Sequence, residues 1–237
     1  MSGASRAGFT IIESMLFLAI SGLMIVGVIA GAGVSINVNR YKDSTTSLDA
    51  YLQGQYDKAI NVQNDRNNQL GCAAGAITDN GNEARGTSAC MIIGRFISVT
   101  NGGTTLESQT VYAAKDGSQS NNDLAALTNS SLFLSSGAEA PESYTLEWGT
   151  KLVTPKFNTP LESMKLLIVR SPSSGTIRTF VADGLSNPVE FLKDQYRQDA
   201  LFCVDQSGLA AIPRRGSLVV KDASNSSGVK MATEGTC

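Results

Sequence analysis

Histidine is absent from all 237 residues. The chain therefore cannot build a Ser-His-Asp or Cys-His catalytic site, and it lacks a common zinc ligand and the commonest general base. Its four cysteines include no C-x-x-C pair, and neither a D-x-D-x-D calcium loop nor a phosphate-binding glycine loop occurs. We therefore expect no enzymatic activity, no cofactor and no metal site.

Charge is missing from one long stretch near the N-terminus. Between Ser14 and Asn39 there is no Asp, Glu, Lys or Arg, and Met15–Ile36 is almost wholly apolar. As a helix, that segment would be about 33 Å long, which matches the hydrocarbon core of a bilayer. A cleaved secretory signal is the alternative, but its apolar core would be about 7–15 residues long. We therefore expect a transmembrane helix that stays attached.

One carboxylate, Glu13, stands at the start of this apolar run. An acid close to the membrane interior is costly, which by default indicates a function and a cationic partner. Removal of the residues before Phe9 would create such a cation, an α-amino group four residues away. The local alternative is that Glu13 begins the first helical turn, where the helix dipole favours acids.

The N-terminus resembles the precursor of a type IV pilin or pseudopilin. The resemblance rests on a short leader, Met1–Gly8, with one basic residue, on Gly8 before Phe9, on Glu13 and on the uninterrupted apolar helix. It implies that a prepilin peptidase cleaves between Gly8 and Phe9 and methylates the new amino group of Phe9. It also implies that Glu13 serves packing in a filament. Many relatives carry a helix-bending proline where this chain has glycines, so the resemblance leaves any bend open.

The resemblance divides the chain into three parts. Residues 1–8 would be a cleaved leader, 9–38 a transmembrane and filament-core helix, and 39–237 a periplasmic or extracellular pilin-like domain. The implied partners are the prepilin peptidase, other pilin subunits and an inner-membrane assembly machinery. The protein would be a single-pass membrane protein before assembly and part of a surface filament afterwards. A net charge of −2 gives no reason to expect nucleic-acid binding.

The even number of cysteines behind an export signal indicates two disulfides. Three pairings are open, and we favour the sequential one, Cys72–Cys90 and Cys203–Cys237. The chain-entropy model assigns each loop about 3–4 kcal/mol. A metal site of four thiolates is the alternative. The second disulfide would tie down a polar tail that composition alone would leave disordered.

Apolar residues recur at three- and four-residue steps between Leu48 and Ile60, which predicts an amphipathic helix. We expect it to continue the apolar helix as one rod that packs on a sheet. A separate helix joined through Asn37–Ser47 is the alternative. Residues 61–85 read as an irregular loop. The composition predicts strands at Met91–Val99, Thr110–Ala114, Tyr144–Trp148, Met164–Arg170, Thr176–Ala182, Leu201–Val204 and Leu218–Val220.

Two short helices are predicted outside the rod. One lies around Leu124–Leu127. The other, near 188–198, begins with Asn187 as N-cap and Pro188 in the first turn. The expected fold class is α+β, a long N-terminal helix on an antiparallel sheet in the manner of a pilin.

Two further features each have two interpretations. Trp148 is expected to be a core aromatic of its strand rather than a ligand platform. Arg214 and Arg215, with Lys221 nearby, are expected to be solvated surface rather than a binding patch.

The resemblance and the membrane segment together lead us to expect one of three functions. The leading one is a structural subunit of a type IV pilus. The alternatives are a minor pseudopilin of a type II secretion or competence system, and a membrane-anchored adhesin or binding ectodomain that does not polymerise.

Overall fold

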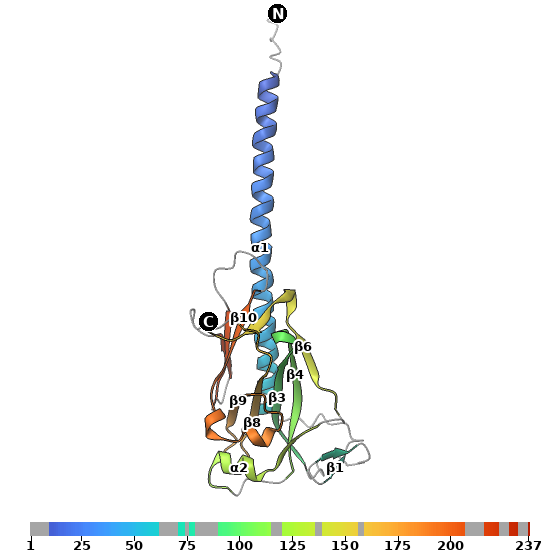
Figure 1. The fold of residues 1–237 in the computed structure, drawn as a ribbon, viewed down its shortest axis with the longest axis vertical. Helices are drawn as coiled ribbons and strands as arrows, with labels where there is room; N and C mark the ends of the chain where they lie inside the picture. Colours follow the sequence, from blue (N-terminus) through green and yellow to red (C-terminus); the bar gives the residue numbers. More distant parts are fainter. Residues whose placement is uncertain are drawn as a thin grey trace, which may run out of the picture.

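The long N-terminal helix, α1 (Ile11–Ile60), runs unbroken for 50 residues. In the computed structural model, the described residues are 10–61, 71–73, 76–78, 90–114, 120–135, 139–155, 159–206, 216–222, 228–231 and 237. α1 contains no proline, and the alternative of two helices joined through Asn37–Ser47 is wrong. Figure 1 shows one half of α1 projecting freely and the other half lying along the sheets. The predicted α+β class is confirmed.

The half of α1 after Arg40 is amphipathic and packs into the core. Its buried residues follow the helical repeat, because they fall three or four positions apart on one face. These residues are Tyr41, Ser44, Thr45, Leu48, Leu52, Gln55, Tyr56 and Ala59. The amphipathic helix predicted from Leu48 onward is therefore confirmed. Its buried stripe begins at Tyr41, two turns before Leu48.

A six-stranded antiparallel sheet covers this stripe. Its strand order is β5-β4-β3-β8-β9, and β6 also pairs with β4. The strands are β3 (Met91–Thr100), β4 (Thr105–Ala113), β5 (Leu132–Leu134), β6 (Glu142–Thr145), β8 (Met164–Arg170) and β9 (Ile177–Asp183). In β8, Leu166 and Ile168 face the α1 cluster, whereas Leu167 and Val169 face a second cluster. The sheet is thus buried on both faces, which explains why Leu166–Val169 of β8 form a continuous apolar run.

A second, four-stranded sheet closes the core around α1. Its order is β12-β11-β10-β7, all antiparallel. The strands are β7 (Lys151–Val153), β10 (Ala200–Asp205), β11 (Gly216–Val220) and β12 (Val229–Met231). Phe202 and Leu218 from this sheet join the same buried cluster as Leu52 and Tyr56 of α1. The half of α1 inside the domain is therefore held by both sheets.

Short helical elements cover the outer face of the six-stranded sheet. The predicted helix near Leu124 is α2 (Asp123–Asn129). The predicted short helix near 188–198 takes the form of two separate 3-10 turns, η3 (Pro188–Phe191) and η4 (Asp194–Tyr196). The extended residue Lys193 separates them, and this break lets the adjacent Phe191 and Leu192 both pack in the second cluster. Asn187 still caps η3, since its side chain accepts a hydrogen bond from the Val189 amide at 3.0 Å.

The structure joins the cysteines sequentially, Cys72 to Cys90 and Cys203 to Cys237, each with Cα atoms 5.8 Å apart. The stretch predicted as irregular between 61 and 85 contains a small hairpin, β1 (Gly71–Ala73) with β2 (Ala76–Thr78). The polar tail likewise contributes β12, which pairs with β11. The three added strands, β1, β2 and β12, are each three residues long, and each lies close to a disulfide-bonded cysteine in the sequence.

Candidate functional site

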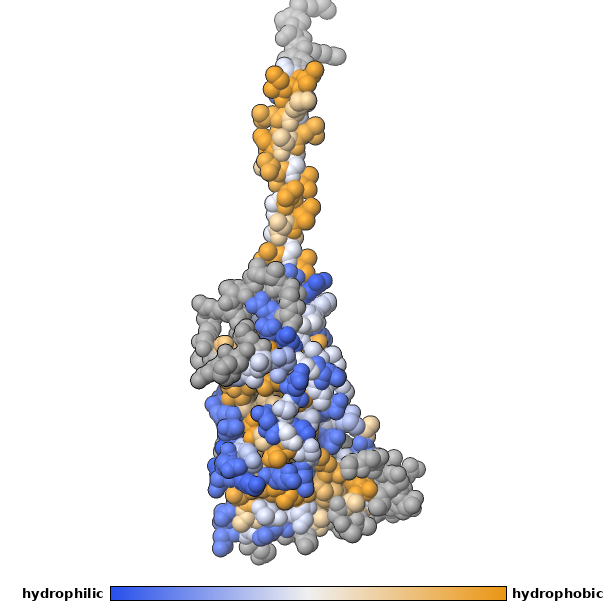
Figure 2. All heavy atoms as spheres, viewed as in Figure 1, coloured by the Kyte–Doolittle hydropathy of each residue, from blue (hydrophilic) through white to orange (hydrophobic). Residues whose placement is uncertain are grey.

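The projecting half of α1 exposes an apolar surface on all sides. Large hydrophobic side chains from Ile11 to Ile36 are 46–78 % exposed. Figure 2 shows mostly apolar residues along the visible face of this half and mostly polar ones over the visible face of the domain. This helix is long and apolar enough to cross a membrane once. Because exposed apolar area of this extent is unfavourable in water, the surface indicates a lipid or protein environment.

Glu13 lies in the first turn of α1 and forms a capping box with Thr10. The Glu13 amide donates to Thr10 Oγ1 at 3.3 Å, and the Thr10 amide donates to Glu13 Oε2 at 3.5 Å. This geometry matches the local interpretation of Glu13 as a residue of the helix start. Gly8 and Phe9 lie outside the described residues, so the Glu13–Phe9 pair stays a prediction. In the single chain, Glu13 therefore has a local role at the helix start. Its side chain is exposed, so the carboxylate can also take part in a contact with another subunit.

The rod is fastened to the domain just beyond the apolar segment. The buried Ser44 and Thr150 hydroxyls are 2.6 Å apart and share a hydrogen bond. Tyr41 is also buried, and its hydroxyl bonds to backbone groups of β10 and β11. These contacts fix the direction in which the apolar half leaves the domain.

Trp148 is not a core residue, and that prediction is wrong. The strand ends at Thr145, and Trp148 lies in the 3-10 turn η2 (Glu147–Gly149) with its side chain 48 % exposed. The Arg40 guanidinium lies over the indole, 4.8 Å from its centroid, and the indole N–H donates to Asp43 Oδ2 at 3.4 Å. Gly149, directly after Trp148, was the sequence signal for a turn.

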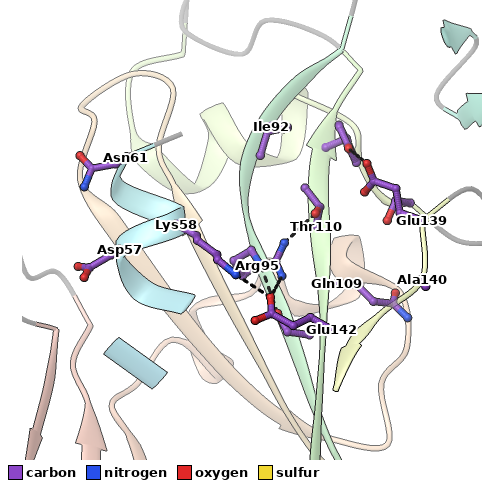
Figure 3. A pocket seen from close by; sticks show the side chains of 13 residues that line it. Asp57, Lys58, Asn61, Ile92, Arg95, Gln109, Thr110, Glu139, Ala140 and Glu142 are labelled. Atoms are coloured by element: carbon purple, nitrogen blue, oxygen red, sulfur yellow. Dashed lines mark hydrogen bonds and ion pairs between the residues drawn. The ribbon is translucent and has the colours of Figure 1, made fainter. Parts of the chain in front are cut away.

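A polar cavity of about 450 Å³ lies at the opposite end of the buried half of α1. Figure 3 shows it between the last turn of α1, strands β3 and β4, and the chain that leads into β6. β5 and β6 pair with different parts of β4, so that among the described residues Gln109 and Thr110 have no partner strand on that side. The cavity occupies this interruption of the sheet edge.

Arg95 is the central side chain of the cavity. It donates to Gln55 Oε1 at 2.9 Å, Ser108 Oγ at 3.2 Å, Thr110 Oγ1 at 2.7 Å and Glu142 Oε2 at 3.0 Å. It thereby connects α1 with β4 and β6. Sequence analysis missed this site, although Arg95 is the one charged residue in the apolar run Met91–Val99.

Two cations converge on one oxygen of Glu142. Lys58 Nζ lies 2.7 Å and Arg95 Nη2 3.0 Å from Glu142 Oε2 (Figure 3). Burial disfavours the carboxylate, but hydrogen bonds from Lys58 and Gln55, together with the charges of Lys58 and Arg95, outweigh burial and lower the pKa of Glu142. The positive charges of Lys58 and Arg95 and the negative charge of Glu142 thus largely balance one another inside the cavity.

The far wall of the cavity also carries a hydrogen bond between two of its lining side chains. Tyr112 donates to Glu139 Oε1 at 2.9 Å on the far wall. Within the described part of the chain, no group of three or more His, Cys, Asp and Glu residues is placed to hold a metal ion. Arg214 and Arg215 lie outside the described residues, and Lys221 Nζ is 2.6 Å from Asp199 Oδ2 in an ion pair.

Comparison of the chain with family models, with curated proteins and with solved structures found no match.

Proposed function

We propose that this chain is the precursor of a type IV pilin or a related filament subunit. The observation that carries the proposal is α1 itself: one half is apolar and uncovered by any described element, and the other half is built into the domain. Such a rod can first lie in a bilayer and then pack against rods of identical subunits. Head-to-tail contacts between identical subunits produce a helical filament when they do not close into a ring.

In this proposal, a prepilin peptidase cuts after Gly8, and the amino group of Phe9 becomes the methylated N-terminus. The Glu13 carboxylate then compensates that cation in a neighbouring subunit. Because an unpaired charge in an apolar core costs about 3–5 kcal/mol, the pair would set the axial register of the filament. Inner-membrane assembly proteins would draw the processed chain from the bilayer into the filament.

The capping box makes a sharp test available, because glutamine can replace glutamate in such a box. Glu13→Gln keeps the helix start and removes the charge, whereas Glu13→Ala removes both. We expect both variants to be lost from sheared surface filaments by at least about 100-fold, the equivalent of about 3 kcal/mol. If Glu13→Gln assembles normally and Glu13→Ala does not, capping is the role of Glu13. Normal assembly of Glu13→Ala would overturn the pairing mechanism altogether.

Processing is tested separately by the intact mass of the mature protein. The proposal expects the loss of eight residues, one added methyl group and the two disulfides. Assembly in a type II secretion or competence system would give the same mass, so the filament in which the protein is found distinguishes these two roles from a pilus.

The cavity at Arg95 supports a second candidate, a membrane-anchored binding ectodomain. Most of its lining residues are polar or charged, and together with its position at an interrupted sheet edge they suit a ligand with polar groups. Such a protein would not require the Glu13 charge, so normal function of both Glu13 variants would favour it.

A further inference from the structure

The turn that carries Trp148 lies where the projecting half of α1 leaves the domain. Figure 1 shows this yellow segment beside the helix at that end of the domain. Arg40, which stacks on Trp148, is the first charged residue after the apolar run, four positions beyond Ile36. At a rise of about 1.5 Å per residue, Trp148 lies beside a point about 6 Å past the apolar segment.

That offset matches the polar layer of a membrane. A bilayer is about 40–45 Å thick with its headgroups and about 30 Å without them, so each headgroup layer is about 5–7 Å deep. If the apolar run fills the hydrocarbon core, the indole lies in the adjoining headgroup layer. Tryptophan favours this layer because its ring is apolar while its N–H remains polar.

The local structure holds the indole in this exposed position. Trp148 has φ 58°, in the left-handed region that bulky residues rarely adopt, and Gly149 has φ 72°. On one side of the turn, Leu146 is buried and its amide donates to the Thr104 carbonyl at 2.8 Å. On the other side, Thr150 bonds to Ser44 of α1. The domain thus fixes both ends of the turn and leaves the aromatic ring half uncovered.

The neighbouring charges suit a headgroup layer. Arg40 and Lys42 are exposed on α1, and the acids Asp43 and Glu147 lie beside them. The Arg40 guanidinium over the ring is within the range of a cation–π contact. Cations beside an aromatic ring can bind lipid phosphates, and the acids keep the patch from being strongly basic.

We infer that Trp148 and Arg40 form an anchor in the phospholipid headgroup layer, which seats the domain on the membrane surface while α1 spans the bilayer. This inference rests on the membrane-spanning part of the proposed function and is independent of filament assembly. A seated domain cannot tilt freely on its helix, so subunits would meet the assembly machinery in one orientation. Extraction into a filament would have to release this contact.

The chain contains one tryptophan, so its intrinsic fluorescence reports on Trp148 alone. The full chain is reconstituted at low density in phosphatidylcholine vesicles that contain lipids spin-labelled either near the headgroup or near the end of the acyl chain. We expect emission at shorter wavelength than in water, with quenching by the shallow label at least about twofold greater than by the deep one.

Two variants in a Trp148→Phe background calibrate the measurement. Ile25→Trp places the probe in the middle of the apolar run Met15–Ile36 and should be quenched most by the deep label. Val189→Trp places it in η3, which packs with α2 on the outer face of the six-stranded sheet, and should remain unquenched.

The outcomes separate the two proposals. If Ile25→Trp is quenched by the deep label but Trp148 behaves like Val189→Trp, the headgroup anchor is wrong and the membrane span stands. If Ile25→Trp is not quenched either, the span fails and the anchor with it. If the Trp148 emission shifts only as protein density rises, without lipid quenching, the surface contacts a second copy of this chain, which also overturns the anchor.

Discussion

The hydroxyl of Tyr41 donates a 2.7 Å hydrogen bond to the carbonyl of Val204. The same oxygen accepts a hydrogen bond from the amide of Gly216, which is the cross-strand neighbour of Val204 in the β10–β11 ladder. One side chain of α1 therefore binds both strands at the end of their ladder. This buried contact lies one residue after Arg40, at the point where the rod enters the domain.

Tyr41→Phe should lower the stability of the domain by about 1–3 kcal/mol, because it leaves buried backbone groups without a partner. For a chain of this size, that corresponds to about 2–4 °C in Tm for each kcal/mol. Thermal unfolding of the detergent-solubilised chain measures the shift. Tyr144→Phe is the matched control, since the buried Tyr144 hydroxyl makes no hydrogen bond among the described residues. Equal shifts for the two variants would contradict the assigned role of Tyr41.

Asp123 should make stability depend on pH in the acid range. The Arg178 guanidinium donates to Asp123 Oδ2 through Nε at 2.8 Å and through Nη2 at 2.5 Å. Burial opposes ionisation, but hydrogen bonds from Ser174, Ser171 and Arg178 outweigh it and lower the pKa of Asp123 from 3.8 to about 2. A lowered pKa stabilises the fold above the unfolded value, and this contribution is lost as the pH falls from about 4 to about 2.

The test compares Tm at pH 7, 4, 3 and 2 for the wild type and Asp123→Asn. The wild type should have the higher Tm at neutral pH, and its Tm difference from Asp123→Asn should narrow between pH 4 and pH 2. The Tm difference between the wild type and Arg178→Met should narrow over the same range, because this variant lacks the charge that holds Asp123 ionised. Parallel curves for the three proteins would show that this pair does not govern the acid response.

The sequence predicted the elements that carry their own periodicity. α1 followed from an apolar run, an amphipathic repeat and the absence of proline before Pro141. β8 matches its predicted range, Met164–Arg170, because its centre, Leu166–Val169, is buried on both faces and is apolar at every position. These signals are local and strong.

The elements that the sequence did not predict depend on distant partners. β5, β7 and β12 are three residues long, so their pairing with β4, β10 and β11 defines them more than their composition does. The cavity was not predicted for the same reason, because its side chains come from distant parts of the sequence. Arg95 and Glu142 are 47 positions apart and meet only through the register of β4, where Thr110 pairs with Arg95 and Ser108 pairs with Glu142.

Loss of the Cys203–Cys237 disulfide should loosen the C-terminal edge of the four-stranded sheet. The bond closes a loop with a sequence separation of 34, for which chain entropy gives about 4 kcal/mol. β12 lies just before Cys237 and is held to β11 by a three-residue ladder and by the bond from the Lys221 amide to the Gly228 carbonyl. Cys237→Ser should therefore accelerate amide hydrogen exchange in Val229–Met231 more than elsewhere.

Cys72→Ser is the matched control for this local effect. It opens the Cys72–Cys90 loop, whose sequence separation is 18, and leaves the four-stranded sheet untouched. Exchange in Val229–Met231 should then remain as in the wild type. Equal acceleration in both variants would mean that the disulfides act through global stability alone.

Arg95 and Lys58 share the same oxygen of Glu142, yet their removal should have different costs. The Arg95 side chain is 12 % exposed and bonds to three further side chains, whereas the Lys58 side chain is 49 % exposed. Exposed ion pairs contribute about 0–1 kcal/mol, because water screens them and ordering a long side chain costs entropy. Hydrogen bonds from a buried charged group contribute about 1.5–3 kcal/mol each and are not additive.

Arg95→Met should therefore lower the free energy of unfolding by about 2–4 kcal/mol, and Lys58→Met by less than about 1 kcal/mol. Chemical denaturation of both variants measures the difference, and a cycle of each with Glu142→Gln isolates the pair energy. The Arg95–Glu142 coupling should exceed the Lys58–Glu142 coupling, because less water lies around the guanidinium. If the two couplings are equal, the attraction of unlike charges alone holds Glu142. The hydrogen bonds that join α1, β4 and β6 through Arg95 would then contribute little to the closure of the sheet edge.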